Sequence, residues 1–193
     1  MAKPVLHHVT LKTDRLDEMI EWYGTVVGAE VVYRFESAAW TTNDDANHRV
    51  AFLRYPDVSD DPDHDRHPGM QHMAFEFEDP EDLLRNYERV RDLGIRPVVC
   101  LDHGSQVSFY YADPDDNAVE LQFDGFGDWA KSTEWIRTSP DFARDPIGTE
   151  IDPEKFVAAW HAGEPVMELH RRARAGDFRP EVAFEIPIRP TSR

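Results

Sequence analysis

The sequence predicts a mixed α+β protein built from two βαβββ modules that form one metal-binding cleft, followed by a C-terminal helical annex. The order strand, helix, three strands can be read twice, over about residues 4–56 and again over about 69–124. The interval from His8 to Gly28 nearly matches that from His72 to Gly94, which indicates an internal repeat. From about residue 125 the pattern changes to short helical segments joined by proline-rich connectors.

Bulk composition narrows the class of protein. A chain of 193 residues can bury a real core, as one domain or two small fused modules. A net charge of −17 without a basic cluster argues against nucleic acid and anionic membranes as partners. No stretch approaches the roughly 20 apolar residues of a membrane span, and the N-terminus has no signal-like apolar region. Cys100 is the single cysteine, so we expect a reducing, cytoplasmic location.

The first module opens with an expected strand over residues 5–11. Asp14 can then cap a helix that Gly28 ends. The apolar positions of this helix recur at helical spacing. They are Leu16, Met19, Ile20, Tyr23 and Val27. Further strands are expected over residues 30–35, 38–42 and 48–55.

The second module opens with residues 72–77, which alternate like a half-buried strand. Asp79 and Pro80 provide an N-cap followed by proline at the first helical position, and Gly94 ends the helix. Its buried face is expected to contain Leu83, Leu84, Tyr87 and Val90. Strands follow over residues 95–100, 107–111 and 118–123, with a turn at 113–117.

Residues 125–193 form the annex of the same domain, whose first part is residues 1–124. Short helices are expected over residues 129–136, 153–161 and 165–175, and residues 182–188 are either a strand or an extended tail. The annex could cover the site or join two copies of the chain in a homo-oligomer, and both roles stay open. His161 and His170 have no metal-like partner spacing and receive no role.

Strand parity brings out three candidate ligands. In three expected strands, one face is apolar and the opposite face carries His8, His72 or Glu120. The apolar sets are Val9 with Leu11, then Met73 with Phe75 and Phe77, then Val119 with Leu121 and Phe123. Because side chains alternate between the two faces of a strand, the three ligands point into one cleft if these strands line it.

Two imidazoles and one carboxylate form the facial triad of non-haem Fe(II) oxygenases. Such a triad leaves about three octahedral positions open, enough for a chelating catechol and for O₂. A lone histidine on a strand is more often structural, and His7 competes with His8 for the first position. The equivalent placement of all three ligands in a repeat is the stronger signal.

Three segments resemble a known family. They are LHHVTLKTDRLDEMIEWYGTVVG, GMQHMAFEFEDPEDLLRNYERVRDLGI and VSFYYADPDDNAVELQF. Over roughly residues 4–124 the chain resembles the vicinal-oxygen-chelate (glyoxalase/bleomycin resistance/dioxygenase) superfamily. Within it, the chain looks like the small single-domain type I extradiol ring-cleaving dioxygenases, the group that contains catechol 2,3-dioxygenase and 2,3-dihydroxybiphenyl 1,2-dioxygenase.

The resemblance implies roles for six residues. The iron ligands would be His8, His72 and Glu120, with Fe(II) as the expected metal and Mn(II) as the alternative. His48 matches a histidine that handles protons, and Tyr110 matches a tyrosine that hydrogen-bonds the substrate. His103 resembles a further histidine upstream of that tyrosine, although the interval is shorter here than in the family. Tyr111 competes with Tyr110 by parity, and a solvated role for His48 stays open.

The implied activity is Fe(II)-dependent extradiol cleavage of a catechol-like diol by O₂ to a ring-opened semialdehyde, in aromatic compound catabolism. One alternative is a metal-dependent isomerase, epimerase or transferase of the superfamily. Glyoxalase-type members need a fourth, carboxylate ligand, which residues 48–55 lack, whereas Mn²⁺ members with three ligands stay open. Another is a binding protein for an aromatic compound or antibiotic, which generally lacks the triad. Candidate pocket residues are Trp40, Phe52, Trp129, Trp135 and Phe142.

Overall fold

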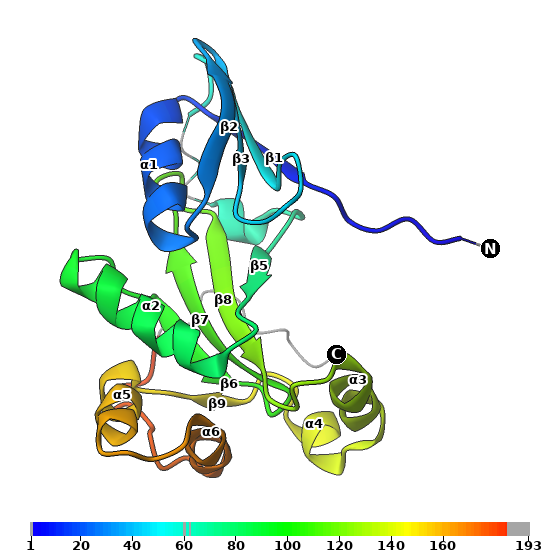
Figure 1. Cartoon of the computed structure of the whole chain (residues 1–193), viewed down its shortest axis with the longest axis vertical. Coiled ribbons are helices and arrows are strands. Elements are labelled where there is room, and N and C mark those ends of the chain that lie inside the picture. Colours follow the sequence, from blue (N-terminus) through cyan, green and yellow to red (C-terminus); the bar gives the residue numbers. More distant parts are fainter. Residues whose placement is uncertain (1, 60, 62, 185–193) are drawn as a thin grey trace. The chain divides into compact units, whose positions relative to one another are not determined.

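The chain folds into two units, each with its own β-sheet (Figure 1). The computed structural model describes residues 2–59, 61 and 63–184. The N-terminal unit comprises the chain up to His67 together with Ala112–Asn117, and the C-terminal unit comprises Pro68–Tyr111 and the chain from Ala118 onward. In the described ranges, no helix is both long and apolar enough to cross a membrane.

The N-terminal unit has a four-stranded sheet in the order β1-β4-β3-β2, in which β1 and β4 are parallel and the other pairs antiparallel. Helix α1 packs against β3 and β4. The bounds are β1 (Val9–Thr13), α1 (Leu16–Val26), β2 (Glu30–Phe35), β3 (Ala38–Thr42) and β4 (Val50–Arg54), followed by the 3₁₀ turn η1 (His64–Arg66).

One face of this sheet forms a core with α1. Leu11 and Phe52 are directly paired across β1 and β4, and both are buried. The helix residues Leu16, Met19, Tyr23 and Val26 are fully buried as well. Thr10 and Lys12 lie on the opposite face and are exposed. The alternation expected for the first strand is therefore confirmed.

The C-terminal unit has a five-stranded sheet in the order β5-β8-β7-β6-β9, in which β5 and β8 are parallel. Annex helix α6 packs against β6, β9, α2 and α5. The strands are β5 (His72–Glu76), β6 (Val99–Asp102), β7 (Gln106–Ala112), β8 (Ala118–Asp124) and β9 (Thr149–Glu150). The helices are α2 (Pro80–Asp92), α3 (Trp129–Thr138), α4 (Pro140–Arg144), α5 (Pro153–His161) and α6 (Val166–Ala175).

The mixed α+β class, the repeated βαβββ order and the annex helices are confirmed. Several strand starts were predicted too early. β1 begins at Val9, so His8 precedes the strand, and β4 begins at Val50, so His48 also precedes it. β6 begins at Val99 rather than at residue 95. In each case the strand-like sequence pattern begins a few residues before the first residue that takes part in backbone pairing.

The cap predicted for the first helix is wrong. The N-cap position of α1 is Arg15 rather than Asp14, and no side chain caps the helix. The sequence also gave no indication of α4 or β9. Residues 182–184 are not in a strand, and residues 185–188 of the expected strand or tail lie outside the described residues.

The cap of α2, in contrast, was predicted correctly, because the Asp79 side chain accepts a hydrogen bond from Glu81 N at 2.9 Å and Pro80 is the first helical residue. We expect Asp79→Ala to lower the free energy of unfolding by about 1 kcal/mol in urea denaturation. Asp14→Ala is the matched control and should cost less, since Asp14 is not the cap of α1. Equal losses in the two variants would contradict this assignment.

Candidate functional site

Three histidines meet at one end of the N-terminal sheet. The parallel pairing of β1 with β4 sets Val9 beside Val50, so the residues that precede both strands are neighbours. His7 Nδ1 lies 3.1 Å from His8 Nδ1, and the ring centroids of His8 and His48 are 4.3 Å apart. One ring nitrogen from each histidine lies within 4.8 Å of the other two. The structure therefore brings the predicted ligand His8 together with the predicted proton-handling His48.

The surroundings of His48 favour the neutral imidazole. Burial lowers the pKa of His48, and the neighbouring rings of His8 and His7 lower it further. His48 Nδ1 lies 2.6 Å from Asn47 Oδ1, so a proton on Nδ1 can be donated to this amide oxygen in a hydrogen bond. The other ring nitrogen then keeps its lone pair, which is the form that accepts a proton.

Arg49 links this end of the sheet to the segment that contains His7 through hydrogen bonds. Its guanidinium donates to His7 O at 3.0 Å and to Asp44 Oδ2 at 2.9 and 2.7 Å. The hydrogen bond from Arg49 lowers the pKa of Asp44 to about 2, so this carboxylate is charged at neutral pH. The backbone just before β1 is thus held by a charged pair as well as by the sheet.

In the C-terminal unit, His72 and Glu120 lie together. The register of parallel strands β5 and β8 sets His72 beside Ala118, two residues before Glu120 on the same face. His72 Nε2 lies 2.9 Å from Glu120 Oε2. Glu120 is only 2% exposed, and burial alone would raise the pKa of its carboxyl. The hydrogen bond from His72 and the charges of His72 and His103 outweigh burial, so the pKa of Glu120 is lowered.

Tyr110 and His103 continue this cluster. Tyr110 Oη donates to Glu120 Oε1 at 3.0 Å, and His103 Nε2 lies 2.9 Å from Tyr110 Oη. Since the phenol proton goes to Glu120, the second contact needs a proton on His103 Nε2 that is donated to the phenol oxygen. Burial raises the pKa of Tyr110, and Glu120 raises it further. Burial lowers the pKa of His103, against the opposing effect of Glu120 and Asp102.

The choice between Tyr110 and Tyr111 follows from strand parity. Tyr111 is fully buried on the other face of β7, and its hydroxyl has no hydrogen-bond partner among the residues that the structure describes. Tyr110 is the tyrosine that contacts Glu120. Of the two tyrosines, Tyr110 is therefore the one that joins the predicted site residues.

The predicted site residues are thus divided between the two units. His8 and His48 are neighbours in the N-terminal unit, and His72, Glu120, Tyr110 and His103 form one connected cluster in the C-terminal unit. The complete triad of His8, His72 and Glu120 stays a prediction.

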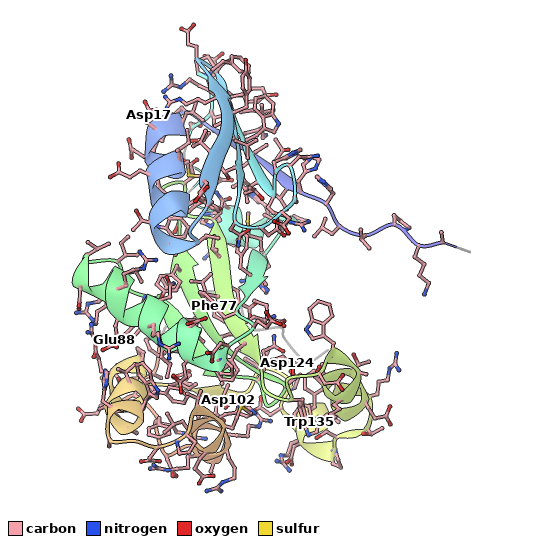
Figure 2. The ribbon with its side chains drawn as sticks, in the orientation of Figure 1. Asp17, Phe77, Glu88, Asp102, Asp124 and Trp135 are labelled. Carbon is pink, nitrogen blue, oxygen red and sulfur yellow. The ribbon has the colours of Figure 1, made fainter. Side chains whose placement is uncertain are left out.

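The sequence did not predict a buried acid–histidine pair in the C-terminal unit. His170 Nδ1 lies 2.7 Å from Asp102 Oδ2, and the Asp102 side chain is fully buried (Asp102 is labelled in Figure 2). These residues are far apart in the chain, on α6 and at the end of β6, so no local spacing could have indicated the contact. The sequence indicates only that one residue is an acid and the other a histidine, two side chains that can form an ion pair.

The lowered pKa of Glu120 predicts a pH-dependent contribution to the stability of the metal-free protein. The ionised carboxylate stabilises the folded state fully above about pH 4.5, the ordinary pKa of a glutamate carboxyl, and this contribution is lost as the pH falls through the lower folded-state pKa. We expect the stability difference between wild type and Glu120→Gln in urea to stay constant from about pH 7 to about pH 5 and to shrink as the pH falls from about 5 to about 3. A difference that stays constant with pH would contradict the assignment.

Comparison with known proteins places the chain in a family. The family model described as the Glyoxalase/Bleomycin resistance protein/Dioxygenase superfamily matches residues 5–121. Biphenyl-2,3-diol 1,2-dioxygenase 2 of Rhodococcus globerulus is 38% identical over 181 residues, which cover 94% of each chain. Biphenyl-2,3-diol 1,2-dioxygenase 3 of the same organism is 38% identical over 172 residues, or 89% of this chain and 90% of the relative.

A solved structure agrees at the level of the fold. The glyoxylase/bleomycin resistance protein/dioxygenase domain from Frankia sp. EAN1pec matches with a TM-score of 0.53 at 18% identity, over 64% of this chain and 93% of that one. The resemblance found in the sequence is confirmed by the family model and the two relatives. The chain belongs to the glyoxalase/bleomycin resistance protein/dioxygenase superfamily.

Proposed function

We propose that this chain catalyses the extradiol cleavage of an aromatic vicinal diol by O₂, giving a ring-opened semialdehyde. The observation that carries the proposal is the connected cluster of His72, Glu120, Tyr110 and His103, which contains two predicted metal ligands and two further predicted catalytic residues. The similarity to two biphenyl-2,3-diol 1,2-dioxygenases over about the whole chain supports the same reaction class.

The residues fit a divalent metal. In the cluster, His72 Nε2 lies 2.9 Å from Glu120 Oε2, and these two side chains would supply an imidazole nitrogen and a carboxylate oxygen to a cation. His72 Nδ1 contacts Gln71 Oε1, as expected when the second nitrogen of a ligating histidine is held by an oxygen acceptor. With His8 as the third ligand, the donor set suits Fe(II) or Mn(II), and we favour Fe(II).

A bound Fe(II) would supply a redox-active centre at which the diol and O₂ are held together and electrons pass from the ring to O₂. The protein residues handle the protons. His48 is neutral at pH 7 because its pKa is lowered, so it is suited to accept a proton from the diol. Tyr110 stays protonated because its pKa is raised, so it acts as a hydrogen-bond donor rather than as a base. His103 holds the phenol oxygen of Tyr110 in place.

An aromatic surface supports a ring-bearing substrate. Tyr33, Phe35 and Trp40 lie on the face of the N-terminal sheet opposite α1, as the pairings of β2 with β3 and of β3 with β4 require. Phe35 and Trp40 are stacked with centroids 5.9 Å apart, and Tyr33 lies 5.9 Å from Trp40. Tyr33 is 62% exposed. Exposed aromatic clusters of this kind mark binding surfaces, and this one suits a substituent ring on the catechol.

The reaction can be tested directly. Protein loaded anaerobically with Fe(II) should consume O₂ and form a yellow product when mixed with catechol, 3-methylcatechol or biphenyl-2,3-diol. His72→Ala and Glu120→Ala should lose both bound iron and activity, since each removes a proposed ligand. His67→Ala is the control, because His67 pairs with Asp61 at an exposed position and is expected to keep both. The proposal is wrong if every diol leaves O₂ untouched while iron is fully bound.

The aromatic surface makes a separate prediction about specificity. We expect Trp40→Ala to raise KM about two- to tenfold for biphenyl-2,3-diol, the range of one lost aromatic contact, with a smaller change for unsubstituted catechol. Trp22→Ala is the matched control, because Trp22 lies on α1, which covers the other face of the sheet. Equal effects of Trp40→Ala on the two substrates would contradict a role for this surface in binding the substituent.

A further inference from the structure

We propose that His170, on annex helix α6, is a positioning residue that acts through Asp102 to hold His103 against Tyr110. The inference rests on the proposed function, in which His103 and Tyr110 serve the ring-cleaving site. It gives the annex a positioning role that follows neither from the reaction class nor from the resemblance to the family. All the residues involved belong to the C-terminal unit.

The contact between His170 and Asp102 is buried and specific. His170 Nδ1 lies 2.7 Å from Asp102 Oδ2, with the two side chains 12% and 0% exposed. A buried carboxylate without a partner is costly, so Asp102 depends on this contact. The other oxygen, Asp102 Oδ1, accepts a hydrogen bond from Gly104 N at 2.8 Å. The carboxylate therefore links α6 directly to the backbone of the β6–β7 turn.

His103 lies inside this turn. It follows Asp102 in the chain and precedes Gly104, and its own backbone N donates to Gln106 O at 2.9 Å. Its side chain reaches Tyr110 Oη at 2.9 Å. The carboxylate of Asp102, which precedes His103, accepts the backbone N–H of Gly104, which follows His103, so the backbone conformation at His103 depends on that carboxylate staying in place.

Other annex residues enclose the same turn. Arg174, one helical turn after His170, donates to Asp102 O at 3.4 Å. A Cβ at Gly104 would lie 2.4 Å from the Trp135 ring of α3 (Trp135 is labelled in Figure 2), and a Cβ at Gly125 would lie 2.6 Å from His170 Nε2. Glycine at these two positions leaves the space that Trp135 and His170 occupy. The packing is therefore built around the turn and the His170 ring.

His170 contacts Asp102, whereas the contact to Tyr110 comes from His103. A change at His170 should consequently affect catalysis through His103 and leave the proposed metal ligands in place. This separates a positioning role from a general loss of structure.

The first test is kinetic and uses the full-length, Fe(II)-loaded protein with biphenyl-2,3-diol. His170→Phe keeps an aromatic ring but removes the N–H donor, and we expect kcat to fall about tenfold or more with KM and iron content nearly unchanged. His170→Asn, which carries an N–H donor at the same δ position, should restore most of the activity. His161→Phe is the matched control, because His161 lies on α5 and pairs with Glu88 at an exposed position.

A double-mutant cycle then identifies the route of the effect. In a His103→Gln background, His170→Phe should lower kcat by no more than about twofold, because the residue it positions is already gone. The proposal is overturned if the two substitutions lower kcat by independent factors, or if His170→Phe alone has wild-type kcat.

A second readout does not depend on activity. In imidazole NMR spectra of the metal-free protein, the His103 signals, assigned by their loss in His103→Gln, should shift in His170→Phe and stay in place in His161→Phe. Unchanged His103 signals in His170→Phe would overturn the proposal. If wild-type protein with bound iron cleaves no diol, the proposed function fails, and the NMR result alone then decides whether His170 positions His103.

Discussion

The buried carboxylate of Glu120 is the constraint around which the C-terminal unit is organised. At 2% exposure it has lost nearly all of its hydration, and an unpaired carboxylate in such a place costs several kcal/mol at least, on the order of the penalty for any buried ion. Both of its oxygens are therefore occupied, one by His72 and the other by Tyr110. The partners that make burial of this charge tolerable are thus two of the residues on which the proposed function rests.

The repeated sheet topology explains why such groups gather at the same place in each unit. In both modules the first strand pairs in parallel with the last strand of the module, β1 with β4 and β5 with β8. This pairing sets His8 near His48 in one unit and His72 near Glu120 in the other. The same backbone plan thus presents imidazoles alone in the first module and an imidazole with a carboxylate in the second.

Periodicity predicted most of the fold, because alternation and helical spacing depend on local burial, and it also separated Glu120 from its apolar neighbours in β8. Periodicity did not predict where the strands begin, because the start of a strand depends on backbone pairing. His8 and His48 precede their strands, since this pairing begins only at Val9 and Val50. The contact between Asp102 and His170 was out of reach for another reason. It joins a strand end to a distant helix, and nothing in the spacing of either segment records it.

The annex is consequently part of the architecture of the C-terminal unit rather than an addition to it. Strand β9 extends the sheet beside β6, and Gly148, just before it, has a positive φ and lies so close to Asp102 O that a Cβ there would be only 2.0 Å from that oxygen. Backbone from the annex thus packs directly on the residue whose carboxylate His170 holds. Because the backbone at Gly148 lies this close to Asp102, the annex cannot move without moving the turn that contains His103. The annex therefore constrains the geometry next to Tyr110.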